Sequence, residues 1–288
     1  MTDPHGQHMT QEPVRIVLNE WAGYPLEREK QLGSNTVLCG LGRLLNNLEK
    51  YDAKLDFTVI LVINRVYGRA RRWIDKAREV IPTLSLVLEA CGVAKVDHAH
   101  QQRMAVYQTL MSRYPFVSEI IYRRNVGRDI GAYDCGYQYL KKRDYDGDVV
   151  FMNSSLTGPD RDGWLVDYAS LYHSDASVGL VGISMNSHDT NRGSPRLDPH
   201  VQSFFLYSSM DKLKDVFPDR LPGMRNRHER QDPITNGEIA ISREMLRSGY
   251  GIACRVFGGD VFFAGNPWKW DEGDLRYSGK LARDANSI

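Results

Sequence analysis

Residues 123–159 read RRNVGRDIGAYDCGYQYLKKRDYDGDVVFMNSSLTGP, and this stretch decides the fold class of the chain. The residues just before it, Val117–Tyr122, are apolar and rich in β-branched side chains, which is typical of a buried strand. A polar turn follows and opens a segment whose apolar residues recur at helical spacing. After a charged turn at residues 141–148, Asp148–Met152 predicts a second buried strand. The stretch therefore predicts a strand, a helix and a strand in succession.

Polar residues follow both of these strands. They are Asn125, Gly127, Arg128 and Asp129 after the first strand, and Asn153, Ser154 and Ser155 after the second. In an open α/β sheet, ligands bind at the carboxyl ends of the strands. A glycine-containing turn that opens a helix also presents N–H groups suited to a phosphate or a carbonyl. We therefore expect a ligand site along this rim.

The rest of the chain repeats the alternation of strands and helices. The other predicted strands are Val14–Leu18, Asp56–Asn64, Val178–Ile183, Val201–Tyr207 and Ile252–Phe257. The other predicted helices cover residues 34–50, with Ser34 as the N-cap, and residues 71–81, 98–113, 164–172, 210–217 and 238–248. This order predicts an α/β fold, a single domain with a mostly parallel central sheet flanked by helices.

The predicted domain occupies residues 13–263. Residues 1–12 are expected to form a flexible leader, and residues 264–288 a tail that packs on the domain or at an oligomer interface. Two long polar loops, residues 184–199 and 218–235, are predicted to be functional lids. The second loop carries four arginines.

Composition excludes several classes of protein. A net charge of +1 gives no reason to expect nucleic acid as a partner. The four cysteines lack metal-type spacing and are expected to be reduced core residues. The sequence shows neither an apolar run of membrane-spanning length nor a P-loop motif. A cytoplasmic location is the expectation.

Four segments occur in the order expected for one known family. They are NVGRDIGAYDCG (125–136), YDGDVVFMNSSLTGP (145–159), HVQSFFL (200–206) and TNGEIAIS (235–242). Together they resemble bacterial polysaccharide-synthesis glycosyltransferases, in particular the group named for rhamnan synthesis protein F, over roughly residues 55–260. Members of this group are similar to the GT-A class of nucleotide-sugar transferases. The resemblance thus implies a GT-A-like domain that transfers a sugar from a nucleotide-sugar donor.

The resemblance also implies roles for particular residues. The turn would grip the donor, with Arg128 neutralising the diphosphate and Asp129 bonding ribose or sugar hydroxyls; the alternative is a helix cap with a surface ion pair. His200 and Gln202 would orient the sugar, unless His200 is simply a partly buried histidine with a backbone partner. Glu238 would deprotonate the acceptor, or else it only caps a helix. A weaker substitute for that base is Asp260.

The position of a metal-binding Asp-x-Asp motif in GT-A transferases reads Asn153-Ser154-Ser155 here. These neutral oxygens are poor ligands for a divalent ion that prefers carboxylates. Asp146 and Asp148 do form such a pair, but they precede their strand and are interpreted as turn residues at the opposite edge. We therefore expect no metal site and no cofactor, with arginines supplying the charge, although Asp129 or Asp260 holding a metal stays open.

Two functions remain open from the sequence. The first is a glycosyltransferase that uses a nucleotide sugar and a glycan or lipid-linked acceptor in cell-surface polysaccharide synthesis. The second is a non-catalytic module of the same fold that binds sugar or nucleotide, or that scaffolds an assembly complex. Peripheral membrane association and a homo-oligomer are left open as well.

Overall fold

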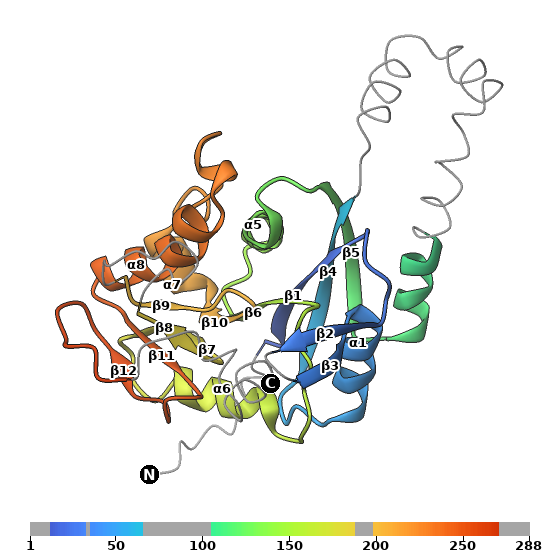
Figure 1. Ribbon diagram of the computed structural model, residues 1–288, viewed down its shortest axis with the longest axis horizontal. Coiled ribbons are helices and arrows are strands. Elements are labelled where there is room, and N and C mark those ends of the chain that lie inside the picture. The colour runs from blue at the N-terminus through green and yellow to red at the C-terminus, as the bar shows by residue number, and fades with distance from the viewer. Residues whose placement is uncertain (1–11, 33–34, 66–104, 188–197, 271–288) are drawn as a thin grey trace, which may run out of the picture.

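The structure, a computed structural model, describes residues 12–32, 35–65, 105–187 and 198–270. Its centre is an eight-stranded sheet with the strand order β12-β11-β7-β10-β6-β1-β4-β5 (Figure 1). Of the seven neighbouring pairs in this sheet, four are parallel (β1·β4, β1·β6, β4·β5 and β7·β11). The other three are antiparallel. The predicted α/β fold with a mostly parallel central sheet and flanking helices is confirmed.

The parallel half of the sheet is built from β1 (Val14–Trp21), β4 (Phe57–Arg65), β5 (Val117–Arg124) and β6 (Asp148–Asn153). β1 and β6 are almost continuously buried because helices cover both sheet faces, which explains their unbroken apolar sequences. From β1 the chain adds β4 and β5 on one side and then returns to place β6 on the other. The carboxyl ends of β1 and β6 therefore form the point where the direction of winding reverses, and ligands bind at such points in open α/β sheets.

The other half of the sheet is mixed. It contains β7 (Val178–Gly182), β10 (Phe205–Ser209), β11 (Gly251–Cys254) and β12 (Val261–Phe262). β10 runs antiparallel to both of its neighbours, β6 and β7. A separate two-stranded ladder joins β8 (Met185–Asn186) to β9 (His200–Val201).

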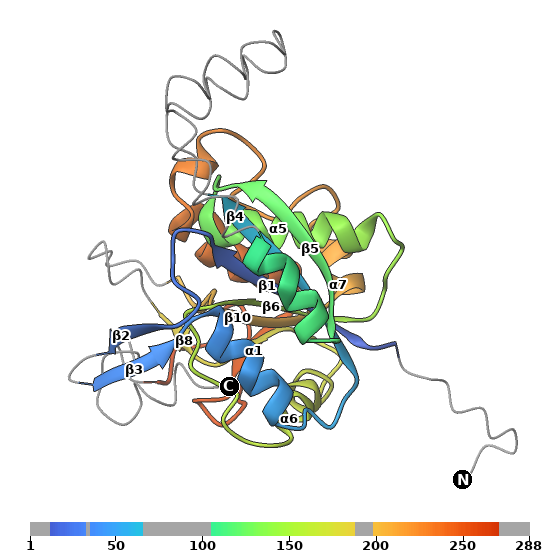
Figure 2. The same ribbon diagram turned by 90° about the vertical axis from the view of Figure 1, so that its right-hand side faces the viewer.

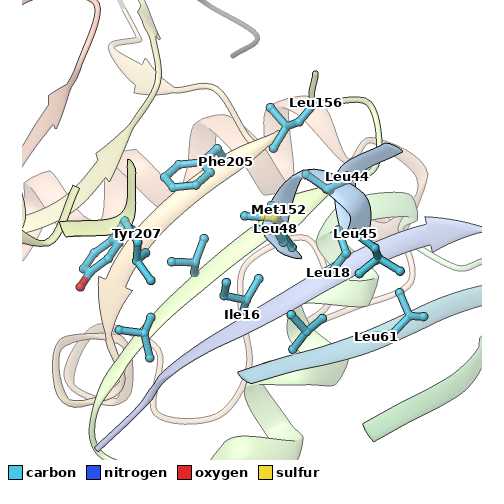
Figure 3. Close-up of a cluster of buried hydrophobic side chains, with 14 of the residues drawn as sticks. Ile16, Leu18, Leu44, Leu45, Leu48, Leu61, Met152, Leu156, Phe205 and Tyr207 are labelled. Atoms are coloured by element: carbon cyan, nitrogen blue, oxygen red, sulfur yellow. The ribbon is translucent and has the colours of Figure 1, made fainter. Parts of the chain in front are cut away.

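One face of the sheet is covered by α1 (Leu41–Lys50), by the helical residues 105–113 and by α6 (Trp164–Tyr172). Figure 3 shows the leucines of α1 lying over Ile16 and Leu18 of β1. Both of these β1 side chains are fully buried.

The opposite face is covered by α5 (Arg128–Lys141), α7 (Met210–Val216) and α8 (Ala240–Arg247). Val17 of β1 points to this face because side chains alternate along a strand. Two cores therefore hold the sheet between helical layers, as Figures 1 and 2 show from two sides.

The predicted helix over residues 34–50 is wrong in its first part. β2 (Arg28–Leu32) and β3 (Asn35–Cys39) form a hairpin, and α1 begins only at Leu41. Gly40 has a φ of 117°, which ends the strand and which a residue with a side chain adopts only under strain. Val37 and Leu38 of β3 fit the helical spacing by coincidence. The predicted N-cap, Ser34, lies outside the described residues.

Other boundaries also differ from the predictions. The first strand continues beyond its predicted end at Leu18 and ends at Trp21. The predicted strand Val201–Tyr207 is divided between β9 and β10. The predicted helix 238–248 is preceded by a 3₁₀ turn (Glu229–Gln231) and a π-helical segment (Ile234–Ile239), and α8 begins at Ala240. Residues 1–11 of the predicted leader, the segment 71–81 predicted as a helix and residues 98–104 of the predicted helix 98–113 lie outside the described residues.

The described part of the tail packs against the mixed half of the sheet. The rings of Trp270 and Phe257 are stacked with centroids 5.0 Å apart, and Trp268 contacts Phe262 edge-on at 5.6 Å. The domain boundary at residue 264 stays a prediction. None of the helices in the described residues is long and apolar enough to cross a membrane.

The close approach of α5 to β1 depends on Gly136. A Cβ at this position would lie 2.3 Å and 2.7 Å from the two γ carbons of Val17. We predict that Gly136→Ala lowers the free energy of unfolding by about 1–3 kcal/mol, because overpacking outweighs the better helix propensity of alanine. Urea denaturation measures this loss. The double variant Gly136→Ala, Val17→Ala should lose less than the sum of the single variants, whereas simple additivity would show that this contact is not the cause.

Candidate functional site

Asp129 lies at the reversal point of the sheet and is held by two asparagines. Asn19, near the carboxyl end of β1, donates from Nδ2 to Asp129 Oδ1 at 2.6 Å. Asn153, at the end of β6, donates from Nδ2 to Asp129 Oδ2 at 2.9 Å. The register of β1 and β6 places the two asparagines directly opposite each other. One carboxylate therefore joins two adjacent strands to the first turn of α5.

A third asparagine extends this network to the next strand. Asn64 of β4 donates from Nδ2 to Asn19 Oδ1 at 2.8 Å. Arg123 of β5 donates in turn to Asn64 Oδ1. Asn19 and Asn64 are 3% and 1% exposed, so these amides exchange hydrogen bonds with protein groups rather than with bulk solvent. The Asn/Asp network thus spans the ends of four parallel strands.

The turn before α5 brings Asp129 into place. Gly127 and Arg128 both have positive φ values, 76° and 49°, so the chain turns sharply where the helix begins. Asp129 then stands in the first turn of a 14-residue helix, where the helix dipole favours negative charge. Desolvation by the surrounding protein nevertheless raises the pKa of Asp129, and the nearby charge of Glu238 raises it further.

A cavity of about 380 Å³ opens above this network. Six residues predicted as donor ligands line it: Asn125, Arg128, Asp129, Asn153, Ser154 and Ser155. Six residues that were not predicted also line it: Asn19, Glu20, Trp21, Tyr24, Arg28 and Asn64. The structure therefore brings the two predicted strand ends together and adds a second wall from β1, the segment after it and the hairpin.

Gly127, which was also predicted as a donor ligand, is buried and does not line this cavity. A Cβ on Gly127 would lie 2.4 Å from the sulfur of Met224, so its role is to allow the turn to pack.

Glu20 and Arg28 are the charged residues that sequence reasoning missed. Glu20 is only 1% exposed, and burial raises its pKa to about 7, opposed by the charge of Arg28. Arg28 donates from Nη2 to the hydroxyl oxygen of Ser154 at 3.0 Å and lies over the Tyr24 ring, 4.1 Å from its centroid. If the first strand had been predicted to extend to Trp21, Asn19 and Glu20 would have been recognised as polar residues at the end of a strand. They would then have been candidate ligands.

His200, Gln202 and Glu238 form a neighbouring cluster outside the lining of this cavity. Glu238 Oε2 accepts from the backbone N–H of Ser203 at 2.7 Å, and Glu238 Oε1 lies 3.8 Å from His200 Nε2. His200 Nδ1 lies 2.7 Å from the carbonyl oxygen of Asp198, and Gln202 Nε2 lies 3.3 Å from His200 Nε2. The cluster is tied to α5, since Tyr133 donates to the carbonyl of Ser203 at 2.7 Å.

The π-helical segment positions Glu238. Its backbone N–H donates to the carbonyl of Pro233, five residues earlier, at 3.1 Å. Such wide helical turns are rare in proteins and occur mostly at functional sites.

Asp260 is not brought to either group of residues. It lies just before β12 at the far edge of the sheet, is 55% exposed and pairs with Lys269 at 2.6 Å. Asp146 and Asp148 lie at the amino end of β6, as predicted, and Asp148 accepts from the Tyr207 hydroxyl at 2.6 Å.

One of the four arginines in the loop 218–235 forms an ion pair with α5. Arg220 donates from Nε and Nη2 to Asp134 Oδ2 at 3.1 Å and 2.6 Å, which fastens the loop to α5. Arg225, Arg227 and Arg230 are exposed. That arginines of this loop supply charge to a diphosphate stays a prediction, and Arg220 would have to leave Asp134 to do so.

A second cavity, of about 970 Å³, lies between β5 and α5. Several of its charged residues bond within its own walls: Arg220 pairs with Asp134, and Tyr139 donates to Glu119 at 2.8 Å. This groove lacks the convergence of strand ends that marks the first cavity.

The residues at the expected metal position do not fit a divalent ion. The carboxylate next to Asn153 belongs to Asp129, and both of its oxygens already accept hydrogen bonds from side-chain amides. Asn153 Oδ1 accepts from the backbone N–H of Ser155 at 3.0 Å and from its hydroxyl. Within the described ranges, no group of three or more His, Cys, Asp and Glu side chains is placed to hold a metal ion.

Comparisons with known proteins place this site in a family context. The family model described as rhamnan synthesis protein F matches residues 98–257, which is 160 of the 288 residues and includes α5, β6, His200 and Glu238. No curated protein matches the chain. Among solved structures, a cytidylyltransferase from Leptospira borgpetersenii serovar Hardjo-bovis is similar, with 11% sequence identity and a TM-score of 0.37. That similarity covers 83% of this chain and 74% of the other, and it is too distant to assign a ligand.

The buried carboxyl of Glu20 should make stability depend on pH. Because its pKa is raised from 4.5 to about 7, the folded state binds more protons than the unfolded state between these pH values. The contribution of Glu20 to the free energy of unfolding is fully present below pH 4.5. It is lost as the pH rises to about 7, and the loss is at most about 3 kcal/mol. Glu20→Gln should remove that loss. The free energy of unfolding of the variant, measured by urea denaturation, should therefore increase relative to that of wild type from pH 4.5 to pH 8. Glu29→Gln, on the exposed side of the hairpin, is the control, and equal slopes for Glu20→Gln and wild type would contradict the prediction.

Proposed function

This chain belongs to the rhamnan synthesis protein F family, and we propose that it is a glycosyltransferase. It moves a sugar from a nucleotide-sugar donor to a glycan or lipid-linked acceptor in polysaccharide synthesis. The observation that carries the proposal is the cavity at the reversal point of the sheet, where the Asn/Asp network and two arginines line one space. Open α/β sheets bind their ligands at this point.

The charge in the cavity suits the leaving group of such a reaction. When the bond from the anomeric carbon to the diphosphate breaks, the electron pair stays on the departing nucleoside diphosphate. Arg28 and Arg128 line the cavity, and the first N–H groups of α5 have no acceptor within the helix. Positive groups that are already in position stabilise the developing charge without reorganisation.

Glu238 is our candidate for the base. In the proposed step the acceptor oxygen attacks the anomeric carbon, and Glu238 Oε1 takes the hydroxyl proton. Glu238 Oε2 is held by the N–H of Ser203 at 2.7 Å, which fixes the carboxylate and leaves Oε1 facing His200. Its side chain is 16% exposed, so an acceptor hydroxyl can approach it. His200 would act by orienting Glu238 or the acceptor.

The second candidate is a binding module without catalysis. The observation in its favour is that Asp129 and Asn153 bond to each other at the position where the resemblance expects metal ligands. Such a module would bind a nucleotide sugar at the same cavity and leave it intact.

Turnover of nucleotide sugars separates the two candidates. Incubation with a panel of nucleotide sugars should release nucleoside diphosphate slowly by hydrolysis, and faster with a suitable acceptor. Glu238→Gln should lower kcat by about 10²–10⁴-fold if this carboxylate is the base. Asp260→Asn is the matched control, because its exposed carboxylate lies away from the cavity, and it should turn over like wild type. Tight binding of a donor without release of diphosphate would favour the binding module.

The reaction should not require a divalent metal. The strand ends offer amide and hydroxyl oxygens that are already bonded, so arginines must supply the charge that a metal supplies elsewhere. Turnover should survive excess EDTA with less than a twofold change. Loss of turnover on chelation, with recovery on adding Mn²⁺, would contradict this prediction.

A further inference from the structure

Arg28 and Glu20 lie next to each other in the cavity wall without forming a hydrogen bond. Arg28 Nη1 lies 3.7 Å from Glu20 Oε2, which is too far for a hydrogen bond. In the described structure neither atom has a hydrogen-bond partner, although both are buried. A buried donor or acceptor without a partner is destabilising, so such atoms in a cavity wall point to a group that binds there.

The guanidinium of Arg28 is nevertheless fixed in position. Its Nη2 bonds both the hydroxyl and the carbonyl oxygen of Ser154, at 3.0 Å and 3.3 Å, and its plane lies against Tyr24. It therefore stands beside the strand end that carries Asn153 and Ser154. Arg28 and Arg128 line the same cavity.

The charges around Glu20 leave the cavity positive near neutral pH. The charged side chains in its lining are Glu20, Arg28, Arg128 and Asp129, and burial raises the pKa of both acids. Cys39 of β3 also interacts with Glu20, and burial raises the pKa of that thiol. A cavity lined by two arginines, and by two acids whose pKa values are raised, favours an anion.

We propose that Arg28 receives the diphosphate of the donor and that Glu20 takes up a proton when the diphosphate binds. This inference rests on the proposed function and gives the donor site a second wall outside the family match, since residues 20 and 28 precede residue 98. A negative charge about 6 Å from a carboxylate raises its proton affinity on the order of a hundredfold at an effective dielectric constant near 20. Protonation of Glu20 removes its repulsion of the diphosphate. It also removes the negative charge that competes with the diphosphate for Arg28.

Calorimetry of the full chain tests this coupling. The probes are UDP, GDP and dTDP, together with inorganic pyrophosphate, which carries the diphosphate without a base. Titrations at pH 8 in buffers of different ionisation enthalpy report the protons taken up per ligand bound. With the three nucleoside diphosphates, whose phosphates are ionised at pH 8, we expect wild type to take up about 0.8 proton per ligand bound. Pyrophosphate still carries a proton at this pH and therefore reports affinity only.

Single-residue variants test whether Glu20 takes up the proton and whether Arg28 binds the diphosphate. Glu20→Gln should bind with no proton uptake at pH 8, and Arg28→Ala should bind at least tenfold more weakly. Arg28→Lys keeps the charge and should recover part of that affinity. Arg247→Ala, an exposed arginine on α8, is the matched control and should bind like wild type.

The outcomes separate this inference from the proposed function. Binding without proton uptake in wild type, uptake that persists in Glu20→Gln, or full affinity in Arg28→Ala would each overturn the inference while the proposed function stands. If none of the four probes binds wild type, both are overturned. Should Glu20→Gln fail to fold, the wild-type uptake and the two Arg28 variants still decide the matter.

Discussion

The hydrogen bonds to Asp129 are the constraint on which the cavity edge of the sheet depends. A carboxylate removed from water is costly unless donors replace its solvation, and here two asparagines from adjacent strands do so. β1, β6 and α5 must therefore keep their separations to within hydrogen-bond tolerance. Gly136 allows α5 to lie against Val17, so packing on the sheet and the chemistry at its edge depend on the same helix position.

The same bonds decide what this edge of the sheet can bind. Because both carboxylate oxygens of Asp129 and the side-chain oxygen Oδ1 of Asn153 already accept hydrogen bonds, they are poor ligands for a metal, and they form a hydrogen-bonded floor instead. Positive charge comes from the walls, Arg128 on the helix side and Arg28 on the hairpin side. This division explains how an anionic donor can be held where a carboxylate pair would otherwise be needed.

Much of this arrangement was predictable because it is local in sequence. The strand, turn and helix around Asp129 and the strand ending at Asn153 are encoded by apolar runs that stop at polar residues, and both were placed at one edge. Glu20 was not predicted as part of the cavity wall because the first strand was predicted to end at Leu18, before Glu20. Arg28 was not predicted because β2, its strand, pairs with a segment that was interpreted as the start of a helix. Asp260 could not be excluded from sequence, since its distance from the cavity depends on the order of strands in the sheet.

The most direct measurement of the central claim is a crystal structure with the nucleoside diphosphate that binds most tightly. The diphosphate should lie above Asp129, between Arg28 and Arg128, in the cavity at the ends of β1 and β6. A nucleotide found instead in the groove between β5 and α5, lined by residues such as Glu119 and Lys142, would contradict the account.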